Sequence, residues 1–189
     1  LLSLALEREA SEFQQRGPVD FGDPNQRQDM DINSAIIDYR GRLSDSVTWQ
    51  ASARYDENSV FDNALTGRVS TVWTISDDTR LRVSAGTGRK NPTFVELFGY
   101  FPGQFISNPE LKPEKSTSFE LGFDRRFGER LDLQVSVFRQ DLEDEINGFV
   151  FDPTTFLATA NNLASDSKRS GAEVALNWSV AETVTINAN

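Results

Sequence analysis

The chain has 189 residues, with 29 acidic and 19 basic side chains, which gives a formal net charge of −10. This acidic balance argues against a nucleic-acid partner, which needs a basic face. The chain contains no Cys and no His, so it lacks disulfides, a His-based catalytic triad and the commonest metal ligand. We therefore expect no enzyme activity, no cofactor and no metal site.

Alternation of apolar and polar residues at period two predicts β-strands in the first half of the chain. The predicted strands cover residues 2–6, 35–39, 47–55, 69–75 and 81–85. The second is the weakest, because Ile36 falls among its polar residues. Residues 10–29 and 56–67 are predicted loops, whereas residues 42–45 and 76–79 are predicted short turns.

In the second half, the same alternation predicts strands at residues 118–127, 131–137, 172–178 and 184–186. A long central loop occupies residues 88–116, and residues 141–168 form another long segment with a local hairpin of 146–151 and 156–160. Prolines at positions 92, 102, 109 and 113 remove backbone donors and restrict their neighbours. The central loop is therefore predicted to contain neither a strand ladder nor a helix interior.

Long and short connections alternate along the chain. In an antiparallel up-and-down meander this places all short turns at one end, as in transmembrane β-barrels. The apolar face carries little charge apart from Arg125, which suits lipid, and the mixed charges of the other face suit a wet or plugged lumen. Tyr39, Trp73, Phe127 and Trp178 fall near short turns and are predicted to form an aromatic girdle.

A soluble β-sandwich binding module with one solvated face would show the same alternation. That alternative accounts less well for the alternating connections and for the aromatic residues near the turns. The predicted fold class is therefore all-β, an antiparallel up-and-down meander. It would be a partial transmembrane β-barrel, with about nine strands of a larger barrel and no plug domain.

Three sequence motifs follow one another from the central loop onward. Residues 88–97 read Gly-Arg-Lys-Asn-Pro-Thr-Phe-Val-Glu-Leu, and residues 108–116 read Asn-Pro-Glu-Leu-Lys-Pro-Glu-Lys-Ser. Residues 161–163, Asn-Asn-Leu, and 170–174, Ser-Gly-Ala-Glu-Val, form the third. From about residue 31 onward the chain resembles the barrel of TonB-dependent outer-membrane receptors, most closely those for ferric siderophores and cobalamin.

The resemblance implies that residues 1–189 are an internal piece of a plugged barrel of roughly 22 strands. The plug, the C-terminal strands and the N-terminal segment that contacts the TonB complex would lie outside this piece. It also implies a place in the outer membrane of a Gram-negative cell, in contact with outer-membrane lipid. The expected function is TonB-coupled uptake of a metal chelate, such as a ferric siderophore, or of a cobalamin-like vitamin.

Candidate ligand-binding residues are cationic, amide and aromatic side chains of the central loop: Arg89, Asn91, Phe94, Tyr100, Phe101 and Phe105. Packing within the loop, or snorkelling of a cation to lipid headgroups, is the alternative role. The motif residues with predicted structural roles are Asn108, Pro109, Leu111, Pro113, Glu114, Gly171 and Glu173. The acidic run at 141–145 offers oxygen ligands for Ca²⁺, but its spacing fits no EF-hand and a solvated loop is preferred.

Two further functions stay open as alternatives. An outer-membrane barrel enzyme, such as a lipase or protease, would commonly need a His base, which this chain lacks. A small closed structural or adhesion barrel would need an even number of strands and a C-terminal aromatic residue, whereas this chain ends in Asn-Ala-Asn.

Overall fold

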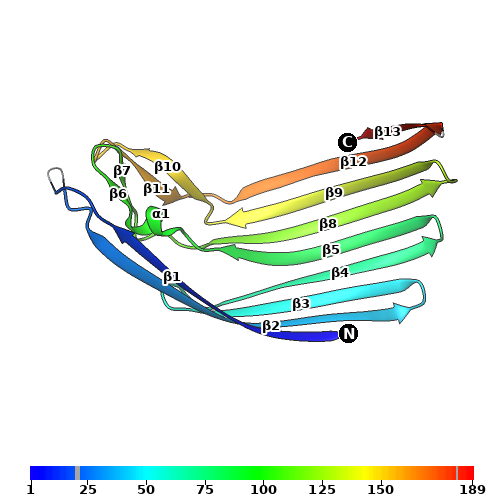
Figure 1. Ribbon diagram of the computed structural model, residues 1–189, viewed down its shortest axis with the longest axis horizontal. Helices are drawn as coiled ribbons and strands as arrows, with labels where there is room; N and C mark the ends of the chain where they lie inside the picture. Colours follow the sequence, from blue (N-terminus) through cyan, green and yellow to red (C-terminus); the bar gives the residue numbers. More distant parts are fainter. Residues whose placement is uncertain (20–21, 182) are drawn as a thin grey trace.

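The computed structural model describes residues 1–19, 22–181 and 183–189. Its main feature is a curved antiparallel sheet of nine strands in the order β1-β2-β3-β4-β5-β8-β9-β12-β13 (Figure 1). Strands of this sheet are neighbours in the order in which the chain visits them, and the two edge strands do not meet. The predicted up-and-down meander, as an unclosed partial barrel, is confirmed.

The strands of the large sheet are long, and a second, smaller sheet and a short helix stand at one end of it (Figure 1). The large sheet contains β1 (Leu2–Gln15), β2 (Gln26–Ser44), β3 (Val47–Asn58), β4 (Ala64–Ser76), β5 (Thr79–Lys90), β8 (Glu114–Phe127), β9 (Leu131–Glu143), β12 (Ser167–Ala181) and β13 (Val184–Ala188). The smaller sheet, ordered β10-β11-β7-β6, contains β6 (Tyr100–Phe101), β7 (Phe105–Ile106), β10 (Ile146–Asp152) and β11 (Leu157–Asn162). The helix is α1 (Phe94–Phe98), and no helix among the described residues is long and apolar enough to cross a membrane.

The apolar face of the large sheet is open. Leu121 on β8 lies opposite Val83 on β5 and Val137 on β9, and it is 49% exposed. Trp178 on β12 is 44% exposed. The chain therefore does not form the soluble β-sandwich that was the alternative, because a sandwich would bury this face against a second sheet.

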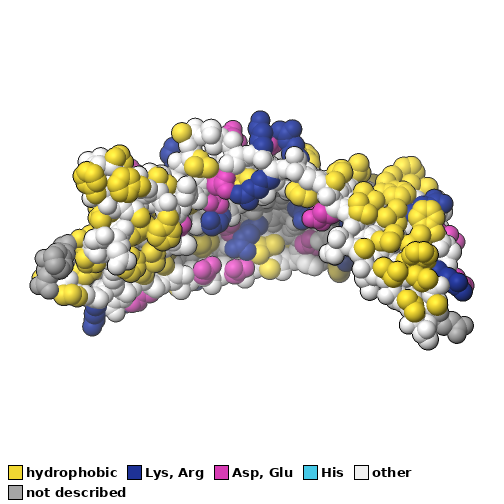
Figure 2. Space-filling view, turned by 90° about the horizontal axis from the view of Figure 1, so that it is seen from above, with side chains coloured by type: hydrophobic (Ala, Val, Ile, Leu, Met, Phe, Trp, Pro, Cys, Tyr) yellow, Lys and Arg dark blue, Asp and Glu magenta, His cyan; other side chains and the backbone are white. Residues whose placement is uncertain are grey.

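The opposite face carries paired charges. Arg82 donates two hydrogen bonds of 3.0 Å to the carboxylate of Asp124 and lies 3.9 Å from Glu120. Arg54 contacts Asp56 at 2.7 Å and Glu7 at 3.2 Å in the same way. Figure 2 shows charged side chains of both signs in the hollowed middle of the molecule, between hydrophobic groups toward its two ends. This face is the polar lumen side that the alternation predicts.

Several strands are longer than predicted at the end of the sheet that carries the long loops. Residues 10–15 and 26–29, predicted as loop, continue β1 and β2, which stay paired as far as Gln15 and Gln26. Residues 56–58 and 64–67 likewise belong to β3 and β4. The apolar alternation ends where both faces of a strand contact water, but the backbone ladder continues because its hydrogen bonds do not depend on side chains.

Candidate functional site

The candidate site is a folded unit at the long-loop end of the sheet, which we call the loop assembly: α1, β6, β7, β10, β11 and residues 107–113. It joins the central loop to the loop between β9 and β12. The prediction that the central loop holds no helix or strand is wrong, because it contains α1, β6 and β7. The prolines at 92 and 102 lie outside these elements, so they do not interrupt them.

Helix α1 forms because its first turn is capped on both sides. The Thr93 hydroxyl accepts a hydrogen bond from the backbone N–H of Glu96 at 3.3 Å, and the Glu96 carboxylate accepts one from the N–H of Thr93 at 2.7 Å. This reciprocal capping box satisfies two N–H groups that would otherwise lack partners. Gly99 ends the helix by donating its N–H to the carbonyl of Val95 at 2.8 Å.

Backbone pairing joins the two loops. Phe105 on β7 lies beside Ala158 on β11 in a parallel pair, and the Ala158 N–H donates to the carbonyl of Gln104 at 2.9 Å. The predicted hairpin of 146–151 with 156–160 is present as β10 and β11, although Phe156 lies in its turn rather than in a strand. The small sheet therefore contains strands from both loops.

Two asparagines of the sequence motifs connect the loops again. The Asn108 side chain donates to the carbonyl of Ala160 at 3.0 Å and to the side-chain oxygen of Asn161 at 3.1 Å. Asn162 bonds both the N–H and the carbonyl of Lys112, at 2.8 and 2.9 Å. The Asn-Pro-x-Leu-x-Pro-Glu and Asn-Asn-Leu motifs therefore contact each other through these hydrogen bonds.

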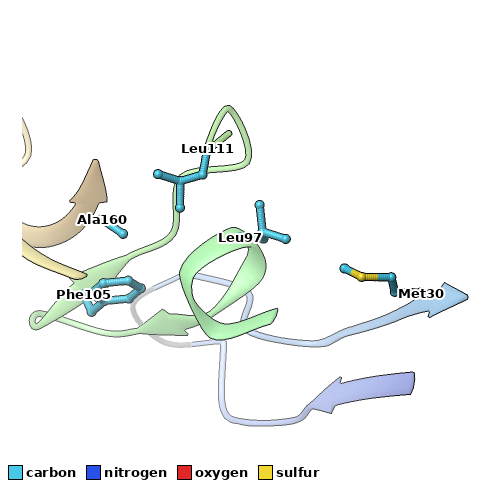
Figure 3. Packing of buried hydrophobic residues seen from close by; sticks show 5 residues of the cluster. All are labelled: Met30, Leu97, Phe105, Leu111 and Ala160. Atoms are coloured by element: carbon cyan, nitrogen blue, oxygen red, sulfur yellow. The ribbon is translucent and has the colours of Figure 1, made fainter. Parts of the chain in front are cut away.

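A small apolar core lies inside the loop assembly. Its members are the buried residues Met30, Leu97, Phe105, Leu111 and Ala160 (Figure 3). Leu97 comes from α1, Leu111 from the second motif and Met30 from β2. Phe105, predicted as a ligand residue, is 4% exposed and thus packs inside this core. Side chains from two connections of the sheet, and from strand β2, hold the unit together.

The extensions of β1 and β2 also hold the loop assembly. The Gln15 side chain donates to the carbonyl of Tyr100 at 2.5 Å and accepts from its N–H at 3.1 Å. Gln26 donates to the carbonyl of Phe98. The ring of Phe94 stacks on that of Phe13, with 5.8 Å between their centroids. These contacts give Phe94 and the backbone of Tyr100 structural roles in holding the loop assembly on β1.

Arg89 and Asn91 are the predicted ligand residues that the structure brings together. The Arg89 Nε donates to Asn91 Oδ1 at 3.2 Å. Both line a pocket of about 240 Å³ on the lumen side, together with Ile32, Arg54, Asp56, Asn58, Asp62 and Ala64. The other four predicted ligand residues do not line this pocket, so the six do not form one site.

The predicted structural residues lie as follows. Leu111 is 3% exposed, and Pro109 and Pro113 flank it in the connection that leads into β8. The Glu114 carboxylate accepts hydrogen bonds from the Ile146 N–H at 2.9 Å and from Lys90 at 3.1 Å. It therefore bonds a lysine and a backbone group.

Gly171 and Glu173 lie on β12, away from the loop assembly, opposite Phe138 and Ser136 of β9. A Cβ at position 171 would stand 2.8 Å from the ring of Phe138. Position 171 therefore has no room for a side chain unless that ring moves.

The loop assembly carries an exposed set of rings, of which only Phe101 was among the candidates predicted from the sequence. Phe149, Phe151 and Phe156 are 81%, 62% and 75% exposed, and Phe101 is 44% exposed; we call these four residues the aromatic platform. Phe151 and Phe156 meet edge to face at 6.2 Å. The spacing of Phe149 and Phe151 in one predicted strand was the available signal, since alternate residues share a face.

The turn of the β10–β11 hairpin has unusual backbone geometry and is held by one carboxylate. Phe156 has a φ of 59°, a left-handed conformation that bulky side chains rarely adopt. The Asp152 carboxylate accepts hydrogen bonds from the Thr154 N–H and the Thr155 hydroxyl, both at 2.8 Å. These bonds hold the pKa of Asp152 below its ordinary value, and the bond from the Thr154 N–H has the largest effect.

The acidic run at 141–145 is partly neutralised by ion pairs. Asp141 lies 3.1 Å from Arg139, and Glu145 pairs with Arg169. A hydrogen bond from Ser167 and the charge of Arg169 lower the pKa of Glu145. Among the residues that the structure describes, no three acidic side chains come together in a way that could hold a metal ion.

Comparisons with known proteins agree with this architecture. The family model described as TonB dependent receptor-like, beta-barrel, matches residues 7–189. The chain is 38% identical over 101 residues to the vitamin B12 transporter BtuB of Vibrio vulnificus, and 32% identical over 107 residues to BtuB of Photobacterium profundum. These matches cover 53% and 56% of this chain, but only 16% of either transporter.

A solved structure shows the same fold. The crystal structure of the siderophore receptor PirA from Pseudomonas aeruginosa superposes on 98% of this chain with a TM-score of 0.80. The identity is 17%, and the superposed part is 38% of that receptor chain. The chain described here thus spans a minor part of the proteins that it matches.

Proposed function

Because this chain belongs to the TonB-dependent receptor β-barrel family, we propose that it forms part of a Gram-negative outer-membrane receptor for a ferric siderophore or for a vitamin such as cobalamin. The family comprises receptors and transporters. The observation that carries the proposal is the prefolded loop assembly at one end of a sheet whose outer face is apolar and open. A ligand would meet this assembly before it enters the barrel.

Residues 1–189 would form one continuous part of the barrel wall. The strands β1 and β13 are the edges of the sheet, and each leaves backbone groups without sheet partners on one side. In hydrocarbon each unpaired group costs several kcal/mol, so further strands must close the barrel. In this proposal other segments of the receptor supply those strands, the plug and the contact with the TonB complex.

The charged face would hold the plug. The Arg82–Asp124 and Arg54–Asp56 pairs stand on the lumen side, where their side chains are 20–40% exposed. Partly exposed charges of both signs can exchange partners with a plug at little net cost, since ion pairs in contact with water contribute only about 0–1 kcal/mol each. Such a surface suits a plug that must rearrange during transport.

The aromatic platform supports binding of a flat, partly apolar ligand, because exposed aromatic rings stack well on such surfaces. The identity to two vitamin B12 transporters supports cobalamin, and the fold shared with a siderophore receptor supports a metal chelate. Arg89, beside the pocket that it lines with Asn91, would attract the anionic groups of either ligand.

Uptake by a complete receptor that contains this chain tests the proposal. We expect cells that express it to accumulate radiolabelled cyanocobalamin or a ferric siderophore, and to lose this uptake when the TonB complex is removed. The double variant Phe149→Ala, Phe151→Ala should lower uptake, whereas Phe119→Ala, which removes an exposed ring on the outer face of β8, should not. Failure to accumulate either ligand with a working TonB complex would contradict the proposed function.

A further inference from the structure

Arg125 is the one charged side chain on the outer face of strands β3 to β9 between the row of Leu121 and the short turns, whereas Arg139, on the same face nearer the loops, pairs with Asp141. It shares a face of β8 with Leu121 and Phe123, and it lies opposite Thr79 on β5 and Leu133 on β9. The other paired outward positions between the row of Leu121 and the short turns are Val47, Trp49, Thr71, Trp73, Thr79, Leu81, Val83, Leu121, Phe123, Phe127, Leu131, Leu133, Val135 and Val137. None of these could neutralise its charge.

The guanidinium of Arg125 is oriented by two neighbours. One nitrogen, Nη1, donates to the Thr79 hydroxyl at 3.1 Å, and the guanidinium carbon lies 5.2 Å from the centre of the Phe127 ring. Thr79 is 5% exposed, whereas Arg125 itself is exposed. A guanidinium carries five N–H donors, and the structure places no carboxylate among the described residues within ion-pair distance of it. The remaining donors are therefore available on the outer surface.

The position of Arg125 along the strand places it at the height of the predicted aromatic girdle. Its row lies between that of Trp73, Leu81 and Phe123 and that of Phe127, Leu131 and Trp178. These rows stand at the short-turn end of the sheet, which is the right-hand side of Figure 1. Aromatic girdles of barrels mark the boundary between hydrocarbon and headgroups.

We propose that Arg125 binds the phosphate of a glycerophospholipid headgroup in the membrane leaflet next to the short turns. A planar guanidinium forms paired, charge-assisted hydrogen bonds with a phosphate, and the phosphate supplies the negative charge that the surrounding side chains lack. Thr79 and Phe127 orient the guanidinium of Arg125 before the lipid binds, which lowers the conformational entropy lost on binding. The inference rests on the proposed membrane location, but not on transport of any ligand.

Native mass spectrometry of the complete receptor with added dimyristoylphosphatidylglycerol tests this site. We expect Arg125→Gln to weaken retention of the lipid about tenfold and Arg125→Lys to weaken it less. The matched control is Arg126→Gln, because Arg126 is the next residue, carries the same charge and pairs with Asp132 on the opposite face. It should retain the lipid as the unchanged receptor does. Equal retention by Arg125→Gln and the unchanged receptor would overturn the inference.

A second measurement separates lipid binding from packing. In vesicles of phosphatidylglycerol, Arg125→Gln should lower the unfolding midpoint of the receptor, and in vesicles of phosphate-free digalactosyldiacylglycerol it should lower it much less. An equal loss in both lipids would show that Arg125 only packs against Thr79 and Phe127. A receptor that transports neither ligand but needs Arg125 to retain phosphatidylglycerol would contradict the proposed function and leave this inference standing.

Discussion

The side-chain amide of Asn162 holds the backbone of Lys112, 50 residues away in the chain. Its oxygen accepts from the Lys112 N–H at 2.8 Å, and its nitrogen donates to the Lys112 carbonyl at 2.9 Å and to the Asp144 carbonyl at 2.7 Å. One amide therefore serves three backbone groups from two loops. Such a contact replaces the ladder hydrogen bonds that irregular backbone cannot form with itself.

Asn162→Ala should loosen the loop assembly, because three backbone groups lose their partner. We expect a cost of about 1–3 kcal/mol in the free energy of local opening, measured by hydrogen exchange in the complete receptor. Asn147→Ala on β10 is the control, since the Asn147 side chain is exposed and accepts only one long bond, 3.4 Å, from the Phe149 N–H. Equal protection factors in both variants would contradict the role assigned to Asn162.

Leu97→Ala should destabilise the same unit more strongly, because Leu97 is 2% exposed at its centre. Removal of a fully buried leucine typically costs about 2–5 kcal/mol. Val95→Ala in the same helix, where Val95 is 42% exposed, should cost much less. Loss of exchange protection is expected around residues 105, 111 and 160 and not in the middle of β3 to β5. A loss that extends over the whole sheet would show that the loop assembly is not a separate unit.

Substitutions of Phe156 can separate effects on the stability of the β10–β11 turn from effects on ligand binding. Phe156→Gly should stabilise the hairpin turn by about 1 kcal/mol, because glycine adopts the left-handed conformation without the steric penalty. The same change should weaken binding of the transported ligand, since it removes a ring of the aromatic platform. Phe156→Ala is the comparison: it removes the ring but keeps the penalty. Tighter ligand binding by Phe156→Gly than by the unchanged receptor would exclude Phe156 from the binding surface.

Acid should loosen the β10–β11 turn. The pKa of Asp152 is lowered in the folded protein, so its contribution to stability is complete above the unfolded value of about 3.9 and disappears as the pH falls through the folded value. We expect exchange protection of the Thr154 amide to fall below about pH 4 and to become independent of pH in Asp152→Asn. Unchanged protection down to the point of global unfolding would contradict this role.

The sheet could be predicted from residues 47–55, 69–75 and 118–127 because an apolar environment on one side of a wall imposes period two on the side chains. The loop assembly could not. Residues 94–98 are helical because of a local capping box, which the prolines around them obscured. Beyond the apolar band, both faces of a strand meet water, so nothing in the sequence of residues 10–15 or 26–29 distinguishes a ladder from a loop.

The sequence by itself determined the meander, its two unlike faces and the family motifs, because each of these depends on neighbours within a few positions of the chain. The tertiary structure decided which side chains share a site. It buried Phe105, placed Arg89 and Asn91 at one pocket, left Phe149 and Phe156 on the surface and joined Asn162 to Lys112. The physical reason is that these arrangements depend on contacts between loops far apart in the chain, and such contacts leave no period in the sequence.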